Sequence, residues 1–335
     1  MNRKKILIAA LSLLLVVGAA LGLGGILFSQ FIIQPLSQST TITIEKGWGV
    51  ARVAQELEKR HILSSASWFR LLVKLDGKGF IKAGEYQLAA GLTPPEILSQ
   101  LKKGEVVQYR LSFPEGLTVQ EMVDLMKKAG LPGSDTLLSQ ADLTKTLGVD
   151  APNLEGWFFP DTYHYTKEET ALTLASRMVS RTKKILDSEW AKREPDYSLT
   201  RYETLILASI IEKETGLARE RPLISRVFHN RLQKKMKLQT DPTVIYGIPH
   251  FDGNITRKHL RTPTPYNTYT IPGLPPTPIS NPGREAIHAA LHPQKSEALY
   301  FVSRGDRSHA FSKTLREHEA YVDCYQRKRG CKKVP

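Results

Sequence analysis

The sequence predicts an α+β protein with three parts: a single N-terminal transmembrane helix, a small α+β module, and a larger mixed α+β domain with one buried helix. Three observations lead to this prediction. An apolar run follows the first residues, short helical and strand patterns alternate after it, and one helical pattern at 200–214 is apolar on nearly every side. The 335 residues are 41% hydrophobic and 24% charged, which is typical of globular chains and excludes a disordered one.

The N-terminal run predicts a membrane anchor. Residues 6–28 are almost continuously apolar, and about 20 such residues span a bilayer as a helix. Cations precede the run and no charged residue follows it before Glu45, so we expect the N-terminus in the cytoplasm and the rest of the chain outside. A cleaved signal peptide is the alternative, because Gly18-Ala19-Ala20 resembles a cleavage site. The predicted segments are a cytoplasmic stub at 1–5, a transmembrane helix at 6–28 and a tether at 29–42.

Residues 43–110 are expected to form a compact α+β module. A threonine cap, early prolines and a glutamate three residues after the cap mark the start of its last helix at Thr93. No apolar run here is long enough for a doubly wound sheet. The spacing of apolar residues predicts helices at 49–60, 65–75 and 93–102 and strands at 84–88 and 105–113.

The most informative helix lies within a larger domain expected at 111–325. Thr200 and Glu203 form a capping box, and the apolar run after them ends in Glu212-Lys213-Glu214, shortly before Gly216. A helix that is apolar nearly all round should be buried. Both the low dielectric and the helix dipole at its C-terminal end raise the pKa of a carboxyl group there. A raised pKa is what a general acid requires at neutral pH.

The two glutamates at this helix end are not equivalent. Residues two apart on a helix point about 200° apart, so they do not easily serve one site together. Glu214 stacks over the heavier apolar stripe, which favours it as the perturbed acid. In the alternative, one or both glutamates pair with nearby cations such as Arg219, Arg221 or Arg226.

Two downstream segments are candidates for a polar cleft. Residues 238–247 bring amide, hydroxyl, carboxylate and phenol groups into one short stretch. Residues 262–283 contain seven of the 20 prolines and should form a stiff extended wall that presents Tyr266, Asn267 and Tyr269. Rigid aromatic rings beside amides and hydroxyls suit sugars, which have an apolar face and a polar rim. A proline-rich loop that only closes a core is the alternative.

Other function classes lack their sequence signals. The net charge of +14 by itself suggests nucleic acid, but no binding motif accompanies it and the anchor places most of the chain outside the cytoplasm. There is no CxxC, HExxH, Walker-type glycine loop or G-x-S-x-G motif. His288 and His292 have a spacing able to hold a metal, yet Pro293 follows directly, and we expect no metal site. Whether Cys324 and Cys331 form a disulfide stays open, and 326–335 is expected to be a solvated basic tail.

Several motifs together resemble the YceG-like family of endolytic murein transglycosylases. They stand in the family's order at 155–162, 208–215, 238–247 and 266–270. The resemblance covers nearly the whole chain, from the anchor and a LysM-like module at 43–110 to the C-terminal segments 299–302 and 309–311. Lytic transglycosylases carry a catalytic Glu followed by Ser, and Glu214-Thr215 resembles that pair better than Glu212-Lys213 does.

The resemblance implies cleavage of the β-1,4 bond between N-acetylmuramic acid and N-acetylglucosamine in peptidoglycan, without water, to give 1,6-anhydro ends. Glu214 would be the catalytic residue: it would protonate the glycosidic oxygen and later take the proton from the sugar's C6 hydroxyl. Asp241 as a second catalytic carboxylate is the alternative. The residues expected to line the cleft and bind substrate are Glu212, Gln239, Asp241, Thr243, Tyr246, Asn267 and Tyr269.

The resemblance also implies a cellular setting. No cofactor and no metal are expected. The expected partners are peptidoglycan strands, the membrane through the N-terminal helix, and peptidoglycan synthases, but not nucleic acid. The protein would be a single-pass protein of the cytoplasmic (inner) membrane, with its catalytic domain on the outer side, and would end nascent strands. A non-catalytic peptidoglycan-binding scaffold is the alternative function.

Overall fold

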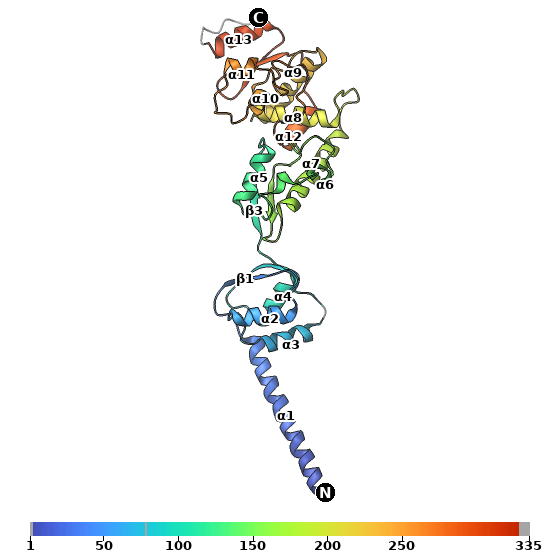
Figure 1. The fold of residues 1–335 in the computed structure, drawn as a ribbon, viewed down its shortest axis with the longest axis vertical. Coiled ribbons are helices and arrows are strands. Elements are labelled where there is room, and N and C mark those ends of the chain that lie inside the picture. The colour runs from blue at the N-terminus through green and yellow to red at the C-terminus, as the bar shows by residue number, and fades with distance from the viewer. Residues whose placement is uncertain (1–2, 78, 328–335) are drawn as a thin grey trace. The chain divides into compact units, whose positions relative to one another are not determined.

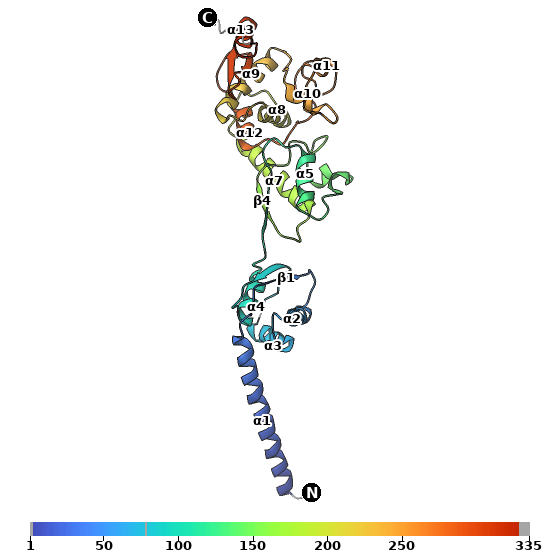
Figure 2. The same ribbon diagram turned by 90° about the vertical axis from the view of Figure 1, so that its left-hand side faces the viewer.

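The computed structural model describes residues 3–77 and 79–327 and divides them into two compact units. The first unit runs to Tyr109 and includes His164–Glu168, and the second contains the remaining residues. Strands β3 (Tyr109–Ser112) and β4 (Thr162–Tyr165) pair with each other where the chain passes between the units. The fold is mixed α+β, as predicted, and Figures 1 and 2 show that each unit has its own arrangement of helices.

A long apolar helix opens the first unit. Helix α1 (Arg3–Ile33) is long and apolar enough to cross a membrane between Leu7 and Ile33, with a mean hydropathy of 2.5. It extends beyond the predicted end at residue 28, because Phe28 and Phe31 pack onto the core of the first unit and support the last turn. Strand β1 already begins at Thr40, so the connection is shorter than the predicted tether at 29–42.

The rest of the first unit places helices around a small sheet. Strands β1 (Thr40–Ile44) and β2 (Gly84–Leu88) are antiparallel, with Ile42 opposite Tyr86. The helices that accompany them share one apolar core with the sheet. The strand expected at 105–113 is shorter, since only Tyr109–Ser112 finds a ladder partner. The helices of this unit after α1 are α2 (Val50–Lys59), α3 (Ala66–Asp76) and α4 (Pro94–Lys103).

Helix α8 (Arg201–Glu214) forms the centre of the second unit. Its side chains from Thr204 to Ile211 are all buried, as its apolar pattern predicts, and the capping box of Thr200 and Glu203 is present. Helix α12 packs along it, and Figure 1 shows α9 and α10 beside it. The other elements are α5 (Val119–Lys128), η1 (Leu137–Ser139), α6 (Leu143–Thr146), α7 (Ala171–Trp190), η2 (Ala218–Glu220), α9 (Arg221–Gln233), α10 (Asp241–Tyr246), α11 (Arg257–Arg261), α12 (Arg284–Leu291), β5 (Tyr300–Ser303), β6 (His309–Ser312) and α13 (Leu315–Tyr325).

The proline-rich segment 262–283 packs against the central helix. The hydroxyl of Ser209 accepts a hydrogen bond from the backbone N–H of Ile279 at 3.0 Å, and the hydroxyl of Ser280 donates to the Ser209 carbonyl at 3.2 Å. All of residues 277–283 are buried. This part of the segment therefore closes the core, as the alternative interpretation held, while Tyr269 further upstream reaches a cavity.

Candidate active site

Glu214 lies at the end of α8, where two cavities meet. The larger cavity, of about 400 Å³, and a neighbouring one of about 370 Å³ are both lined by Glu214, Ser303 and His309. The C-cap residue of α8, Thr215, has an extended backbone with φ of −146°, so the helix ends directly after the glutamate. The carboxyl group is thus carried by a rigid buried helix and opens toward both cavities.

The surroundings of Glu214 favour its protonated form. The pKa of this carboxyl group is raised to about 7, chiefly by burial, and the negative charge of Asp241 acts in the same direction. A hydrogen bond from the Thr240 hydroxyl and the charges of His309 and Arg231 act in the opposite direction. Because desolvation is the largest of these effects, the carboxyl holds its proton well above the usual range for glutamate and can donate it near neutral pH.

The segment before α10 supplies the groups around this carboxyl. Gln239 has a left-handed backbone with φ of 50°, and its side-chain oxygen accepts a hydrogen bond from Arg231 at 3.4 Å. Asp241 is the first residue of α10 and accepts a hydrogen bond from the Tyr269 hydroxyl at 2.7 Å. Gln239, Asp241 and Tyr269 all line the larger cavity with Glu214. These three predicted residues are therefore brought together at the site.

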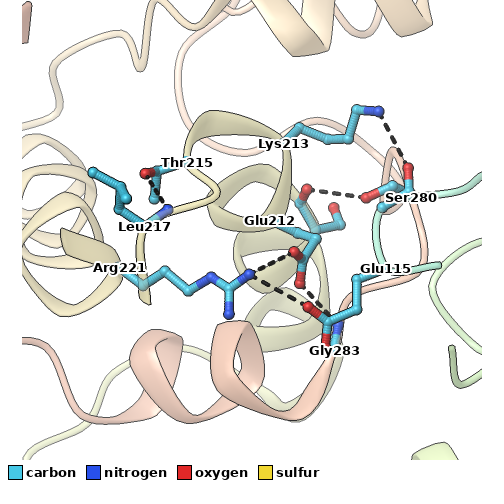
Figure 3. A network of polar contacts seen from close by, with 10 residues as sticks. Glu115, Glu212, Lys213, Thr215, Leu217, Arg221, Ser280 and Gly283 are labelled. Atoms are coloured by element: carbon cyan, nitrogen blue, oxygen red, sulfur yellow. Dashed lines mark hydrogen bonds and ion pairs between the residues drawn. The ribbon is translucent and has the colours of Figure 1, made fainter. Parts of the chain in front are cut away.

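Glu212 belongs to a separate ion network. Its carboxylate accepts hydrogen bonds from Arg221 and from the backbone N–H of Gly283, each at 2.9 Å. Figure 3 shows the Arg221 guanidinium group facing both Glu212 and Glu115, and a carboxylate oxygen of Glu115 lies 3.4 Å from the same guanidinium nitrogen. Glu212 lines neither cavity at Glu214. The alternative of a paired glutamate thus describes Glu212, because its helical position turns it away from the side that Glu214 faces.

Three further predicted cleft residues make internal contacts and line neither cavity. The hydroxyl of Thr243 lies 2.8 Å from both the Thr240 carbonyl and the Thr268 hydroxyl. The buried amide of Asn267 donates to the carbonyls of His259, Leu260 and Thr262. The Tyr246 hydroxyl donates to Glu155 at 3.2 Å. These polar side chains hold the loops that form the site, since buried polar groups need hydrogen-bond partners.

Glu155 joins three segments behind the site. Its carboxylate accepts hydrogen bonds from the backbone N–H of Val119 at 3.0 Å, from the Asn281 amide at 3.2 Å and from Tyr246. Burial raises the pKa of Glu155 to about 7. This glutamate lies within the 155–162 motif but lines neither cavity at Glu214.

The structure adds site residues that were not predicted. Thr240 donates a hydrogen bond to Glu214, and the buried Arg231 binds the carbonyls of Leu238 and Leu299 at 2.8 and 2.7 Å. His309 comes from strand β6, far along the chain. Thr240 stands within the 238–247 segment and His309 begins the 309–311 segment, so the motifs contained both residues, but nothing in the spacing indicated that they approach Glu214.

Within the described residues, one group has the composition of a metal site. The ligand atoms of Glu189, His288 and His292 lie within 4.8 Å of one another. Glu189 already accepts hydrogen bonds from Arg284 at 2.9 Å and from His288 at 3.0 Å. Its charge is therefore balanced by protein cations, and we assign no metal to it. The second cysteine, Cys331, lies outside the described residues, as does most of the tail at 326–335.

Comparison with known proteins identifies the family. Residues 42–324 match the model of the YceG-like family. An endolytic murein transglycosylase from Bacillus subtilis is 30% identical over 325 residues, covering 90% of each chain. One from Streptococcus pneumoniae (strain D39) is 28% identical over 326 residues, and the alignment spans 85% of this chain but 59% of that longer relative. A crystal structure of a YceG-like protein from Listeria monocytogenes has a TM-score of 0.56 and 32% identity, over 84% of this chain and 98% of that one. The chain belongs to the YceG-like family.

Proposed function

We propose that this protein is a membrane-anchored endolytic murein transglycosylase, with Glu214 as its catalytic residue. The single observation that carries the proposal is the position of Glu214: a carboxyl with a pKa of about 7 where two cavities meet. The names of the relatives support the substrate, since those from Bacillus subtilis and Streptococcus pneumoniae are endolytic murein transglycosylases. Two cavities that share the acid as a lining residue give room for sugar units beside it, which suits a chain that is cut internally.

The proposed reaction needs one carboxyl group that exchanges a proton. Glu214 donates its proton to the glycosidic oxygen as the bond from C1 of the N-acetylmuramic acid ring breaks. The C6 hydroxyl of the same ring then bonds to C1, and its proton returns to the Glu214 carboxylate. The ring closes to a 1,6-anhydro sugar and no water is consumed. Ordinary glycosidases generally use a second carboxyl for water or covalent attack, which this internal nucleophile replaces.

Asp241 and Tyr269 support this chemistry from the cavity wall. The Asp241 charge raises the pKa of Glu214, so it keeps the acid protonated. A carboxylate at the same cavity also stabilises the positive charge that develops on the sugar ring at the transition state. The hydrogen bond from Tyr269 holds the Asp241 side chain in place. The proposal assigns no step to a metal or cofactor.

The proposed setting is the outer face of the cytoplasmic membrane. Helix α1 is the anchor, with Arg3, Lys4 and Lys5 on the cytoplasmic side. The first unit is proposed as a LysM-like module that binds glycan, and its order of β1, α2, α3 and β2 around one core supports a compact module. Anchored cleavage of this kind would end nascent strands beside peptidoglycan synthases, which we propose as partners.

Product analysis tests the proposed activity. Purified wild-type protein and the Glu214→Gln variant are incubated with isolated glycan strands, and the ends are identified by mass spectrometry. We expect 1,6-anhydro ends from the wild type and none above background from Glu214→Gln. The matched control is Glu285→Gln, an exposed carboxyl in α12, which should retain the wild-type rate. Glycan binding without anhydro ends in the wild type would instead establish the scaffold.

A further inference from the structure

We propose that His309 binds the sugar at the point of cleavage through its Nε2 atom, and that Glu220 is the residue that positions its ring. This inference rests on the proposed function, because it adds a second substrate contact beside Glu214. The two residues come from different elements, His309 from β6 and Glu220 from η2.

The hairpin of β5 and β6 places His309 in the cleft. Ser303 and His309 lie directly opposite each other in the antiparallel ladder, so their side chains share one face of the hairpin. Both residues line both cavities that meet at Glu214. On the same face the ring of Phe301 packs edge-on against the imidazole, with centroids 5.4 Å apart and an angle of 89°. His309 therefore stands at the junction of the cavities, as Glu214 does.

Glu220 holds His309 by two hydrogen bonds. One carboxylate oxygen lies 2.8 Å from Nδ1 of the imidazole, and the other accepts from the backbone N–H of His309 at 3.1 Å. The side chains are only 12% and 11% exposed. A carboxylate can only accept hydrogen bonds, so Nδ1 carries the proton in this pair. Glu220 thus fixes both the orientation of the imidazole ring and the nitrogen that carries the proton.

The other ring nitrogen is free for a ligand. Among the described residues Nε2 has no hydrogen-bond partner, and it is not one of the buried atoms that lack one. The Nε2 atom is therefore accessible. His309 lines both cavities, so a ligand in them can reach this atom. This nitrogen accepts a hydrogen bond from a sugar hydroxyl when the ring is neutral and donates one to a sugar oxygen when the ring is protonated, so a sugar suits it in either form. A glycan that occupies both cavities must pass Glu214 and His309 together.

A contact at this point would orient the ring that reacts. Closure to the 1,6-anhydro sugar requires the C6 hydroxyl to approach C1, and fixing reacting groups in position removes part of the entropic barrier. His309 is proposed to hold a hydroxyl of this ring, while all proton transfer remains with Glu214. In the competing interpretation, the pair of Glu220 and His309 only joins η2 to the hairpin and stabilises the fold.

A double-mutant cycle separates these interpretations. His309→Ala should lower kcat/KM on glycan strands roughly ten- to a hundred-fold, the range for loss of a hydrogen bond to a polar transition state. Glu220→Ala should cause a similar loss in the wild type but almost none in the His309→Ala background, because it acts through the histidine. Glu220→Gln keeps one acceptor oxygen, which can serve Nδ1, but places an amide N–H against the backbone N–H of His309, so it should restore only part of the rate that Glu220→Ala loses.

The control is a second histidine–carboxylate pair outside the cleft. His288 lies 3.0 Å from Glu189 and lines neither cavity at Glu214, so His288→Ala should leave kcat/KM unchanged. Thermal unfolding identifies variants that fail to fold. The proposal is overturned if folded His309→Ala keeps the wild-type kcat/KM, or if Glu220→Ala costs as much activity without His309 as with it.

Binding measurements keep this inference distinct from the proposed activity. Glu214→Gln protein should bind glycan strands without cleaving them, and adding His309→Ala should weaken that binding at least several-fold. If the wild type forms no anhydro ends, the proposed transglycosylase activity is refuted, but the binding experiment still tests the contact between His309 and the glycan. Equal binding with and without His309 would refute the contact, even where the wild type is active.

Discussion

Replacing Thr240 by valine should move the pH range in which the protein is active. The Thr240 hydroxyl donates to the Glu214 carboxylate and lowers its pKa from what burial alone would produce. A hydrogen bond to a charged group is worth about 1.5–3 kcal/mol, and one pKa unit corresponds to about 1.36 kcal/mol. The pKa of Glu214 should therefore rise from about 7 by roughly one to two units in Thr240→Val.

The assay is the pH profile of kcat for anhydro-end formation. Because the proposed role of Glu214 requires its protonated form, the rate should fall as the pH rises through its pKa, and this limb should move upward in Thr240→Val. The control is Thr243→Val, which removes another buried hydroxyl of the same segment that has no hydrogen bond to Glu214. It should lower the melting temperature and leave the limb in place. An unshifted limb in Thr240→Val would refute the argument for how Glu214 is tuned.

Three further predictions concern stability and location. Arg221→Met should lower the free energy of unfolding by about 3–5 kcal/mol in denaturant titrations, because it leaves the buried Glu212 without its ion pair; an unchanged midpoint would contradict the network. Glu155→Gln should reduce the pH dependence of the free energy of unfolding: burial raises the folded pKa of Glu155 to about 7, so its contribution is fully present below the usual glutamate pKa and is lost as the pH rises through about 7. The remaining slope comes in part from Glu214, whose pKa is also about 7. A slope unchanged from the wild type would show that Glu155 does not contribute to it. Leu14→Arg should weaken membrane association, because an arginine at the centre of a membrane-spanning helix costs about 2.5–3.5 kcal/mol. Cell fractionation measures this association, and an unchanged membrane-bound fraction would contradict the proposed anchor.

The central helix could be predicted because its information is local. The capping box at Thr200, the apolar run and the glutamates lie within 15 consecutive residues, and a helix that is apolar all round has no stable place except a core. The same local reasoning favours Glu214 over Glu212 as the perturbed acid, because more apolar side chains lie on the helix face that precedes Glu214. In the structure Arg221 binds Glu212, whereas the cavities meet at Glu214, and the catalytic role of Glu214 stays a prediction.

The cleft could be predicted only in part, because its contacts join distant segments. A polar side chain in a motif either faces a ligand or satisfies buried backbone, and composition does not separate the two. Asn267 caps three carbonyls of its own loop, whereas Tyr269, two residues later, reaches Asp241. His309 approaches Glu214 only through the pairing of β5 with β6, which no local pattern encodes. Helix α1 continues past residue 28 to Ile33, because its last turn packs onto the core of the first unit.

The most direct measurement of the central claim is the mass of the product formed in ¹⁸O-labelled water. Wild-type protein should yield anhydro ends that contain no ¹⁸O, since the sugar's own hydroxyl attacks, and Glu214→Gln should yield no such ends. Reducing ends labelled with ¹⁸O would show hydrolysis instead, and anhydro ends formed by Glu214→Gln at the wild-type rate would show that the acid lies elsewhere.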